Sequence, residues 1–124
     1  MMIGYVTLGV SNMDRAKQFY TDLFSDLGAK VLIDMGRIAF IGKGGKTPML
    51  AVCEPYDGKP CTTGNGVMVA FAAESKEAVD AQYHKAISLG ATDEGEPGQR
   101  IEDRFYGAYV RDMDGNKIAF YYFG

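Results

Sequence analysis

The sequence holds little of what metal centres, membrane spans and nucleic-acid-binding surfaces require. Its 124 residues include a single histidine and two cysteines. No apolar stretch approaches the roughly 20 residues that a membrane-spanning helix needs. The net charge is −3 and no basic run occurs, so we expect no nucleic-acid partner, because phosphate binding requires clustered Lys and Arg. The N-terminal residues enter strand-like sequence without a signal-peptide pattern, and a cytoplasmic location is expected.

The two cysteines, Cys53 and Cys61, share no metal-ligand spacing with the only histidine, His84. We interpret them as reduced thiols of a cytosolic protein. A disulfide between them would need an oxidising compartment, which nothing in the sequence suggests. His84 lies inside a helical pattern, where a surface position explains it without any ligand role.

The length and composition suit one folded domain. Hydrophobic residues make up 47% and charged residues 23%, which is a normal globular balance. That apolar content is enough for one core, and the chain is too short for two independent ones.

Two segments of the chain repeat the same pattern at an offset of 62 residues. In the first, Asp14-Arg15-Ala16 precedes Leu27-Gly28-Ala29. In the second, Lys76-Glu77-Ala78 precedes Leu89-Gly90-Ala91 by the same distance. The order of the expected elements repeats as well, which indicates two copies of one structural unit.

The first half reads as a strand, a helix and three short strands. Asn12 is suited to cap the helix, apolar residues recur on one helical face, and Gly28 supplies a left-handed stop. We expect the helix near residues 13–27 and strands at 5–10, 30–33, 37–41 and 49–53.

The second half follows the same order. Ser75 can cap a helix over residues 76–89, and Gly90 ends it. A strand at 67–72 precedes this helix, and a short strand at 91–93 leads into a polar loop over 94–103. Strands at 105–111 and 117–123 then pair through a hairpin turn at Asp114-Gly115.

These elements predict an α+β fold of two tandem βαβββ units. We expect one domain over residues 1–124, with unit one at about 1–55, a linker at 55–66 rich in Pro, Gly and Thr, and unit two at about 67–124. Each sheet buries one face on its helix, so the other unit is the available cover for its second face. The two sheets would form a curved mixed sheet around a central trough, the natural place for a ligand.

The opening and closing motifs resemble a known family. The stretch from Tyr5 to Ala16, then Phe19-Tyr20 and Leu27-Gly28-Ala29, is similar to the start of the vicinal oxygen chelate superfamily. The stretch from Gly107 to Asn116 is similar to its ending, although Met113 stands where that family usually has Pro. The superfamily contains glyoxalase I, bleomycin-resistance proteins and extradiol dioxygenases, so the resemblance implies the fold and leaves the reaction open.

The resemblance also implies where a metal would be held. Metal-dependent members bind a divalent ion in the trough through His and Glu side chains from the first and last strands of the units. Those positions fall on Tyr5 and Val67 for His, on Ala119 for one Glu, and on Leu50 or Ala51 for the other. A register shift of one residue would replace Val67 with Met68. None of these side chains is a competent ligand, so we expect no metal and no other cofactor.

Other candidates near the expected trough are weaker. Glu54 follows a strand and could act as a ligand or base, and Cys53 could face the cavity as a nucleophile. An exposed carboxylate and a small buried thiol are the ordinary alternatives. Aromatic residues border the expected trough, among them Tyr106 and Tyr121, and they either fill the core or form walls suited to planar or amphipathic molecules.

The function favoured by the sequence is binding of a small organic molecule in a metal-free trough. The expected binding residues are Tyr5, Cys53, Glu54, Val67, Tyr106, Ala119 and Tyr121. One alternative is a metal-dependent enzyme with atypical ligands, either a glyoxalase-like lyase or a dioxygenase. Another is a protein–protein module whose trough is closed by dimerisation. A homodimer is expected, since dimers are the commonest assembly of such domains.

Overall fold

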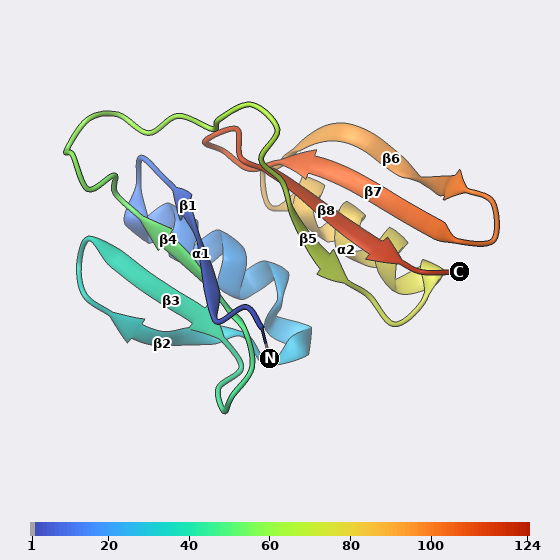
Figure 1. Ribbon diagram of the computed structural model, residues 1–124, viewed down its shortest axis with the longest axis horizontal. Coiled ribbons are helices and arrows are strands. Elements are labelled where there is room, and N and C mark those ends of the chain that lie inside the picture. Colours follow the sequence, from blue (N-terminus) through green and yellow to red (C-terminus); the bar gives the residue numbers. More distant parts are fainter. Residues whose placement is uncertain (1) are drawn as a thin grey trace. The chain divides into compact units, whose positions relative to one another are not determined.

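In the computed structural model, which describes residues 2–124, the chain divides into two compact units between Thr62 and Thr63. In the described residues each unit has one α-helix and one four-stranded sheet, in the order βαβββ (Figure 1). This order confirms the predicted α+β class and the tandem βαβββ units. The division falls inside the expected linker at 55–66.

The first unit has a mixed sheet with strand order β1-β4-β3-β2. Strands β1 and β4 run parallel, and the other neighbouring pairs are antiparallel. Its elements are β1 (Tyr5–Gly9), α1 (Met13–Leu23), β2 (Lys30–Asp34), β3 (Ile38–Gly42) and β4 (Met49–Cys53).

Helix α1 begins at the predicted cap and ends earlier than predicted. The side chain of Asn12 accepts a hydrogen bond of 3.0 Å from the Arg15 backbone N–H, which satisfies a free donor of the first turn. The α-helix stops at Leu23, and residues Ser25–Leu27 form a tighter 3₁₀ turn before Gly28, whose φ is 81°. The expected helix to residue 27 is therefore wrong in its last turn, because an apolar spacing does not distinguish these two helical forms.

An ion pair marks the face of the first sheet that meets α1. Lys17 Nζ on α1 lies 2.9 Å from Asp34 Oδ2 on β2. The residues paired in register with Asp34 point to the same side, and they form the row Asp34, Ala39, Val52 and Leu8. Alternation places the next row, Ile33, Phe40, Ala51 and Thr7, on the opposite side. We call this side the open face of unit 1, since its own helix does not cover it.

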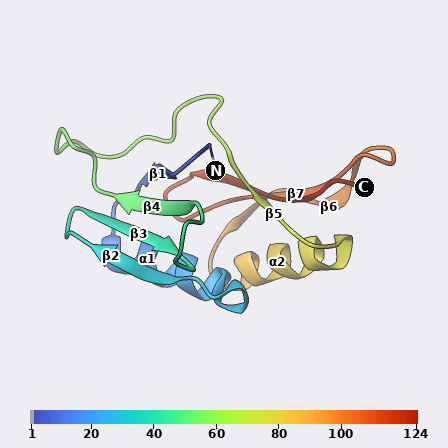
Figure 2. The ribbon, with the colours of Figure 1, turned by 60° about the horizontal axis from the view of Figure 1, so that its bottom comes forward.

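The second unit repeats the arrangement with strand order β5-β8-β7-β6, and β5 and β8 run parallel. Its elements are β5 (Val69–Ala72), α2 (Lys76–Ser88), β6 (Thr92–Ile101), β7 (Phe105–Arg111) and β8 (Lys117–Tyr122). Within each unit the helix lies along one face of its own sheet (Figure 2). Among residues 2–124, no helix has the length and apolar character that crossing a membrane demands.

Strand β6 is the largest departure from the sequence-based expectation. The predicted polar loop over 94–103 is wrong, because a single strand runs from Thr92 to Ile101 and pairs with β7. The register shifts around Gly95 and Gly98, as expected where extra residues bulge out of an edge strand. A charged, Gly- and Pro-containing stretch reads as a loop locally, but the neighbouring strand supplies the ladder that makes it a strand.

A hydrogen bond marks the helix side of the second sheet. The Tyr106 hydroxyl on β7 donates to Asp80 Oδ1 on α2 at 2.6 Å. Residues in phase with Tyr106 therefore face α2, including Phe120 and Ile118 on β8. The alternate residues form the open face of unit 2: Ala70 and Ala72 on β5, Gly107, Tyr109 and Arg111 on β7, and Lys117, Ala119 and Tyr121 on β8.

The hydroxyl of Tyr83 predicts how the stability of the protein depends on alkaline pH. Tyr83 is 5% exposed on α2, and its hydroxyl donates to Asp93 Oδ1 on β6 at 2.8 Å. Burial, and then this hydrogen bond, raise the pKa of Tyr83 to about 12. In the unfolded chain the pKa is near 10. Between pH 10 and 12 the unfolded chain releases this proton while the folded chain keeps it, so stability falls across that window.

We expect Tyr83→Phe to lower the free energy of unfolding by about 1–2 kcal/mol at pH 8, measured by urea denaturation. The difference between wild type and variant should shrink as the pH rises from 10 to 12. Tyr56→Phe is the matched control, because Tyr56 is 91% exposed. This variant should leave the free energy of unfolding unchanged at pH 8 and at pH 12. A difference in free energy of unfolding between wild type and Tyr83→Phe that stays constant up to pH 12 would contradict the raised pKa of Tyr83.

Candidate functional site

Tyr5 lies on the open face of unit 1, where the resemblance implies an imidazole. It pairs in register with Met49 and alternates with Val6, which faces the helix together with Leu50. Its ring meets the ring of Phe40 on β3 edge-on, with centroids 4.9 Å apart. The residue is still 52% exposed. Tyr5 is thus held by an aromatic neighbour while much of its surface stays accessible.

The structure refines the offset between the two repeats. Helix α2 is capped by Ser75, which is 63 residues after Asn12 (75 minus 12). The ends of the first strands give the same offset of 63 (73 minus 10). Val10 N–H donates to the Cys53 carbonyl in unit 1, and Ala73 N–H donates to the Tyr121 carbonyl in unit 2. The offset of 62 holds directly after the helices, where Gly28 corresponds to Gly90 and both have a positive φ. The 3₁₀ turn before Gly28 takes up the extra residue of the first unit.

This refinement decides between the two candidate positions for the second histidine. With an offset of 63, the equivalent of Tyr5 is Met68, the residue directly before β5. Alternation from Ala70 also assigns Met68 to the open face. Val67, predicted as a binding residue, lies one position further from the strand and is exposed.

The same hydrogen bonds locate the carboxylate position of the first unit. Because Val10 binds Cys53 and Ala73 binds Tyr121, Cys53 and Tyr121 are equivalent. Ala51 and Ala119 stand two residues earlier in each unit and are therefore equivalent too. Both lie on open faces, whereas Leu50 faces α1. Of the two candidates that the sequence left open, Ala51 is the one in the implied position.

The residues at these four positions do not fit a divalent metal. Tyr5, Met68, Ala51 and Ala119 offer no imidazole and no carboxylate, the ligands that such ions take in N/O sites. Within residues 2–124, no group of three or more His, Cys, Asp or Glu side chains is arranged to hold an ion. An enzyme with atypical metal ligands thus finds no donor cluster in the part of the chain that the structure describes.

The candidates at the end of β4 lie close to the linker. Cys53 is on the open face of unit 1, opposite Gly9. A side chain at Gly9 would meet the Cβ atom of Cys61 at 3.0 Å, so Cys61 of the linker packs against β1 at the position that has no side chain. Glu54 is exposed, and Arg37 holds its backbone: Glu54 N–H donates to the Arg37 carbonyl and Arg37 Nη1 donates to the Glu54 carbonyl, each at 2.8 Å.

Tyr106 and Tyr121 lie on opposite faces of the second sheet. The Tyr106 hydroxyl is occupied by Asp80 on the helix side, and this hydrogen bond raises the pKa of Tyr106 above its usual value. Tyr121 is on the open face. The structure therefore does not bring these two predicted binding residues together. His84 is exposed on α2 with its ring edge-on to Tyr83, as expected for a helix surface residue.

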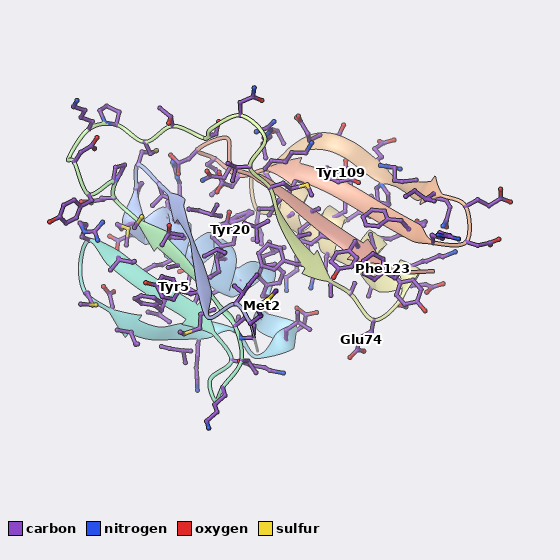
Figure 3. The ribbon with its side chains drawn as sticks, in the orientation of Figure 1. Met2, Tyr5, Tyr20, Glu74, Tyr109 and Phe123 are labelled. Carbon is purple, nitrogen blue, oxygen red and sulfur yellow. The ribbon has the colours of Figure 1, made fainter. Side chains whose placement is uncertain are left out.

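Three aromatic rings gather at one end of the open face of unit 2. The rings of Phe105 and Tyr121 are stacked, with centroids 5.7 Å apart and an interplanar angle of 4°. Phe123 follows β8 and its ring lies 4.7 Å from that of Tyr121. Phe123, which is labelled in Figure 3 together with Tyr5 of the first unit, is 70% exposed by its accessible surface. We call Phe105, Tyr121 and Phe123 the aromatic cluster.

Two cations approach a fourth ring on the same face. The Nζ atom of Lys117 lies 5.2 Å from the ring centroid of Tyr109, and the Cζ atom of Arg100 lies 5.4 Å from it. Sequence reasoning missed both residues. Lys117 alternates in phase with Ala119 and Tyr121, so a strict reading of β8 could have found it. Arg100 lay in the segment predicted as a loop.

The comparison with protein families assigns the fold to a superfamily. A family model described as the Glyoxalase/Bleomycin resistance protein/Dioxygenase superfamily matches residues 2–120. The chain belongs to this superfamily. Membership confirms the resemblance seen in the opening and closing motifs. It leaves the reaction and the ligand unassigned, since one fold carries many functions.

Solved structures of this superfamily agree over nearly the whole chain. A glyoxalase/bleomycin resistance protein from Albidiferax ferrireducens T118 is 35% identical, covers 98% of both chains and has a TM-score of 0.86. A lactoylglutathione lyase from Agrobacterium tumefaciens is 23% identical, covers 97% of this chain and 92% of its own, and has a TM-score of 0.71. The second likeness concerns the fold alone. No curated protein matches the chain.

The donor set predicts the metal content of the purified protein. After expression in medium supplemented with Zn²⁺, Ni²⁺, Fe²⁺ and Mn²⁺, we expect well under one equivalent of each by elemental analysis, because Tyr5, Ala51, Met68 and Ala119 provide no ligand. Near-stoichiometric content of any of these ions would overturn the assignment of the four positions.

Proposed function

We propose that this superfamily member binds a small organic molecule on the open faces of its sheets without using a metal ion. The observation that carries the proposal is Tyr5. An accessible tyrosine occupies the position where the family resemblance implies an imidazole, and the other three mapped positions hold Ala51, Met68 and Ala119. A phenol can orient a ligand by a hydrogen bond and ring contact, whereas divalent ions such as Zn²⁺ take imidazole, thiolate and carboxylate ligands.

The side chains of the open faces support this proposal. Tyr5 and Phe40 provide aromatic surface in unit 1, and the aromatic cluster provides it in unit 2. Small-molecule sites are lined mostly by apolar and aromatic groups, with a few polar groups that fix orientation. Of the predicted binding residues, Tyr5, Cys53, Ala119 and Tyr121 are on open faces.

The metal-dependent alternatives receive less support from this chain. The likeness to a lactoylglutathione lyase is 23% in sequence identity and concerns the fold alone. A lyase or a dioxygenase of this superfamily would need donors that the mapped positions lack. The cytoplasmic location and the homodimer expected from the sequence stay predictions.

A thermal-shift screen with and without divalent metals tests the proposal. A ligand that binds the folded state raises the melting temperature by mass action. We expect hits among planar organic molecules, and we expect their shifts to be the same in EDTA and in added Zn²⁺ or Mn²⁺. Shifts that appear only with a metal would contradict the proposal.

Tyr5→Phe separates a binding role from a packing role. Removing the hydroxyl should weaken binding of a screened hit by about 0.5–1.5 kcal/mol, the worth of one hydrogen bond, with stability unchanged within about 0.5 kcal/mol. Calorimetric titration and urea denaturation measure the two quantities. Tyr122→Phe is the matched control, because Tyr122 is in phase with Tyr106 on the helix side and should leave binding unchanged. Equal binding by wild type and Tyr5→Phe would assign Tyr5 to packing.

A further inference from the structure

The open face of unit 2 has an uneven distribution of charge and aromatic surface. Along β8 the side chains on this face are Lys117, Ala119 and Tyr121, and along β7 they are Arg111, Tyr109 and Gly107. Lys117 and Arg111 are therefore at one end and the aromatic cluster at the other. Arg100 stands on β6 near Phe105, and its guanidinium group approaches the Tyr109 ring between the two ends. Lys117 and Tyr121 are four positions apart on β8, which corresponds to roughly 13 Å at the usual rise of a strand.

The residues between the two ends are small. Ala119 lies opposite Ala70, and Gly107 lies opposite Tyr121, which is itself opposite Ala72. Ala70 and Ala72 are exposed. Gly107 and Ala119 are buried, and the Phe105 ring lies over Gly107, so the accessible small residues of this face are Ala70 and Ala72 on β5. Because Ala72 lies opposite Tyr121, a flat molecule can lie against the backbone of β5 beside that ring.

Of the three cations at this face, only Arg111 has a carboxylate partner among the described residues. Arg111 is neutralised by Glu94, with Nη2 and Oε1 3.2 Å apart. Arg100 donates to the backbone carbonyl of Glu96 and, like Lys117, approaches the ring of Tyr109. Two like charges on one ring repel each other, and an anion between them would relieve that repulsion.

The helix side of the same sheet shows the opposite arrangement. There the Tyr106 hydroxyl is paired with the Asp80 carboxylate, while the ammonium group of Lys76 lies 5.7 Å from the Tyr106 ring centroid. A tyrosine next to a lysine is thus present on both faces. Of Tyr106 and Tyr109, only Tyr106 on the helix side donates its hydroxyl to a carboxylate among the described residues. The shortage of negative charge is therefore a property of the open face and not of the tyrosine–lysine pair.

We propose that the open face of unit 2 binds planar aromatic anions, with Lys117 and Arg100 contacting the anionic group and the rings of Phe105, Tyr121 and Phe123 contacting the aromatic part. This proposal rests on the proposed metal-free binding function and names its ligand class. Arg and Lys form charge-assisted hydrogen bonds to carboxylates, and aromatic rings stack on flat apolar molecules. An aromatic carboxylate satisfies both ends of the face at once.

A matched pair of probes tests the ligand class. 2-Naphthoate is a planar carboxylate, and 2-naphthamide is its neutral amide of nearly the same shape. By calorimetric titration of the full chain in EDTA at low salt, we expect 2-naphthoate to bind roughly 5- to 10-fold more tightly than 2-naphthamide. Its affinity should fall as salt is raised, whereas that of 2-naphthamide should not, because ions screen only the charged contact.

Variants locate the site on the open face. Lys117→Gln and Arg100→Gln should each reduce or abolish the preference for 2-naphthoate and leave 2-naphthamide binding unchanged. Tyr121→Ala should weaken both probes. Lys76→Gln is the matched control, because it removes a lysine from a tyrosine ring on the helix side, and the preference should persist.

The outcomes separate this inference from the proposed function. Equal affinity for the two probes, or binding of neither, would overturn the anion class, and the metal-independent thermal-shift screen would still decide the proposed function. Binding of both probes only with added metal would overturn the proposed function itself. A shift in sedimentation with Lys117→Gln, without any change in probe binding, would assign the face to a second copy of the chain and overturn the proposal.

Discussion

One helix per four-stranded sheet is the constraint on which the rest of the structure depends. In a β-strand, successive side chains point to opposite faces, so a single helix can bury only one of the two rows that each strand presents. In the first unit the buried row includes Leu8, Ala39 and Val52, and in the second it includes Val110, Ile118 and Phe120. The side chains of the other row are not covered by the helix, so they can contact a ligand.

The two faces of the second sheet show how this division is used. On the helix side, tyrosine hydroxyls donate hydrogen bonds to carboxylates, as in the pairs Tyr83–Asp93 and Tyr106–Asp80. These hydrogen bonds tie α2 to β6 and β7, and polar groups near a core need such partners. On the open face the rings of the aromatic cluster contact one another, and the cations near Tyr109 approach that ring instead of a carboxylate. The polar groups of one side stabilise the fold, and we infer that those of the other bind a ligand.

Most of the architecture could be predicted from local signals. Asn12 and Ser75 accept the hydrogen bonds expected of helix caps, and β4 and β7 have the predicted bounds. The repeat and the motifs predicted the βαβββ order and the superfamily. Strand β6 could not be predicted, because its Gly, Pro and charged residues form a strand only through pairing with β7. The candidate site was harder still. Assigning Leu50, Ala51 and Met68 to faces required the register of the strands, and recognising Arg100 required knowing that it lies near Tyr109.

A titration of the protein with 2-naphthoate, once after exhaustive dialysis against EDTA and once with one equivalent of Zn²⁺, Ni²⁺, Fe²⁺ or Mn²⁺, tests the central claim most directly. The account predicts the same affinity and one site per chain under every condition, because the contacts are made by aromatic rings and cations and not by a bound ion. Binding heat that is absent in EDTA and restored by one equivalent of a divalent metal would contradict it.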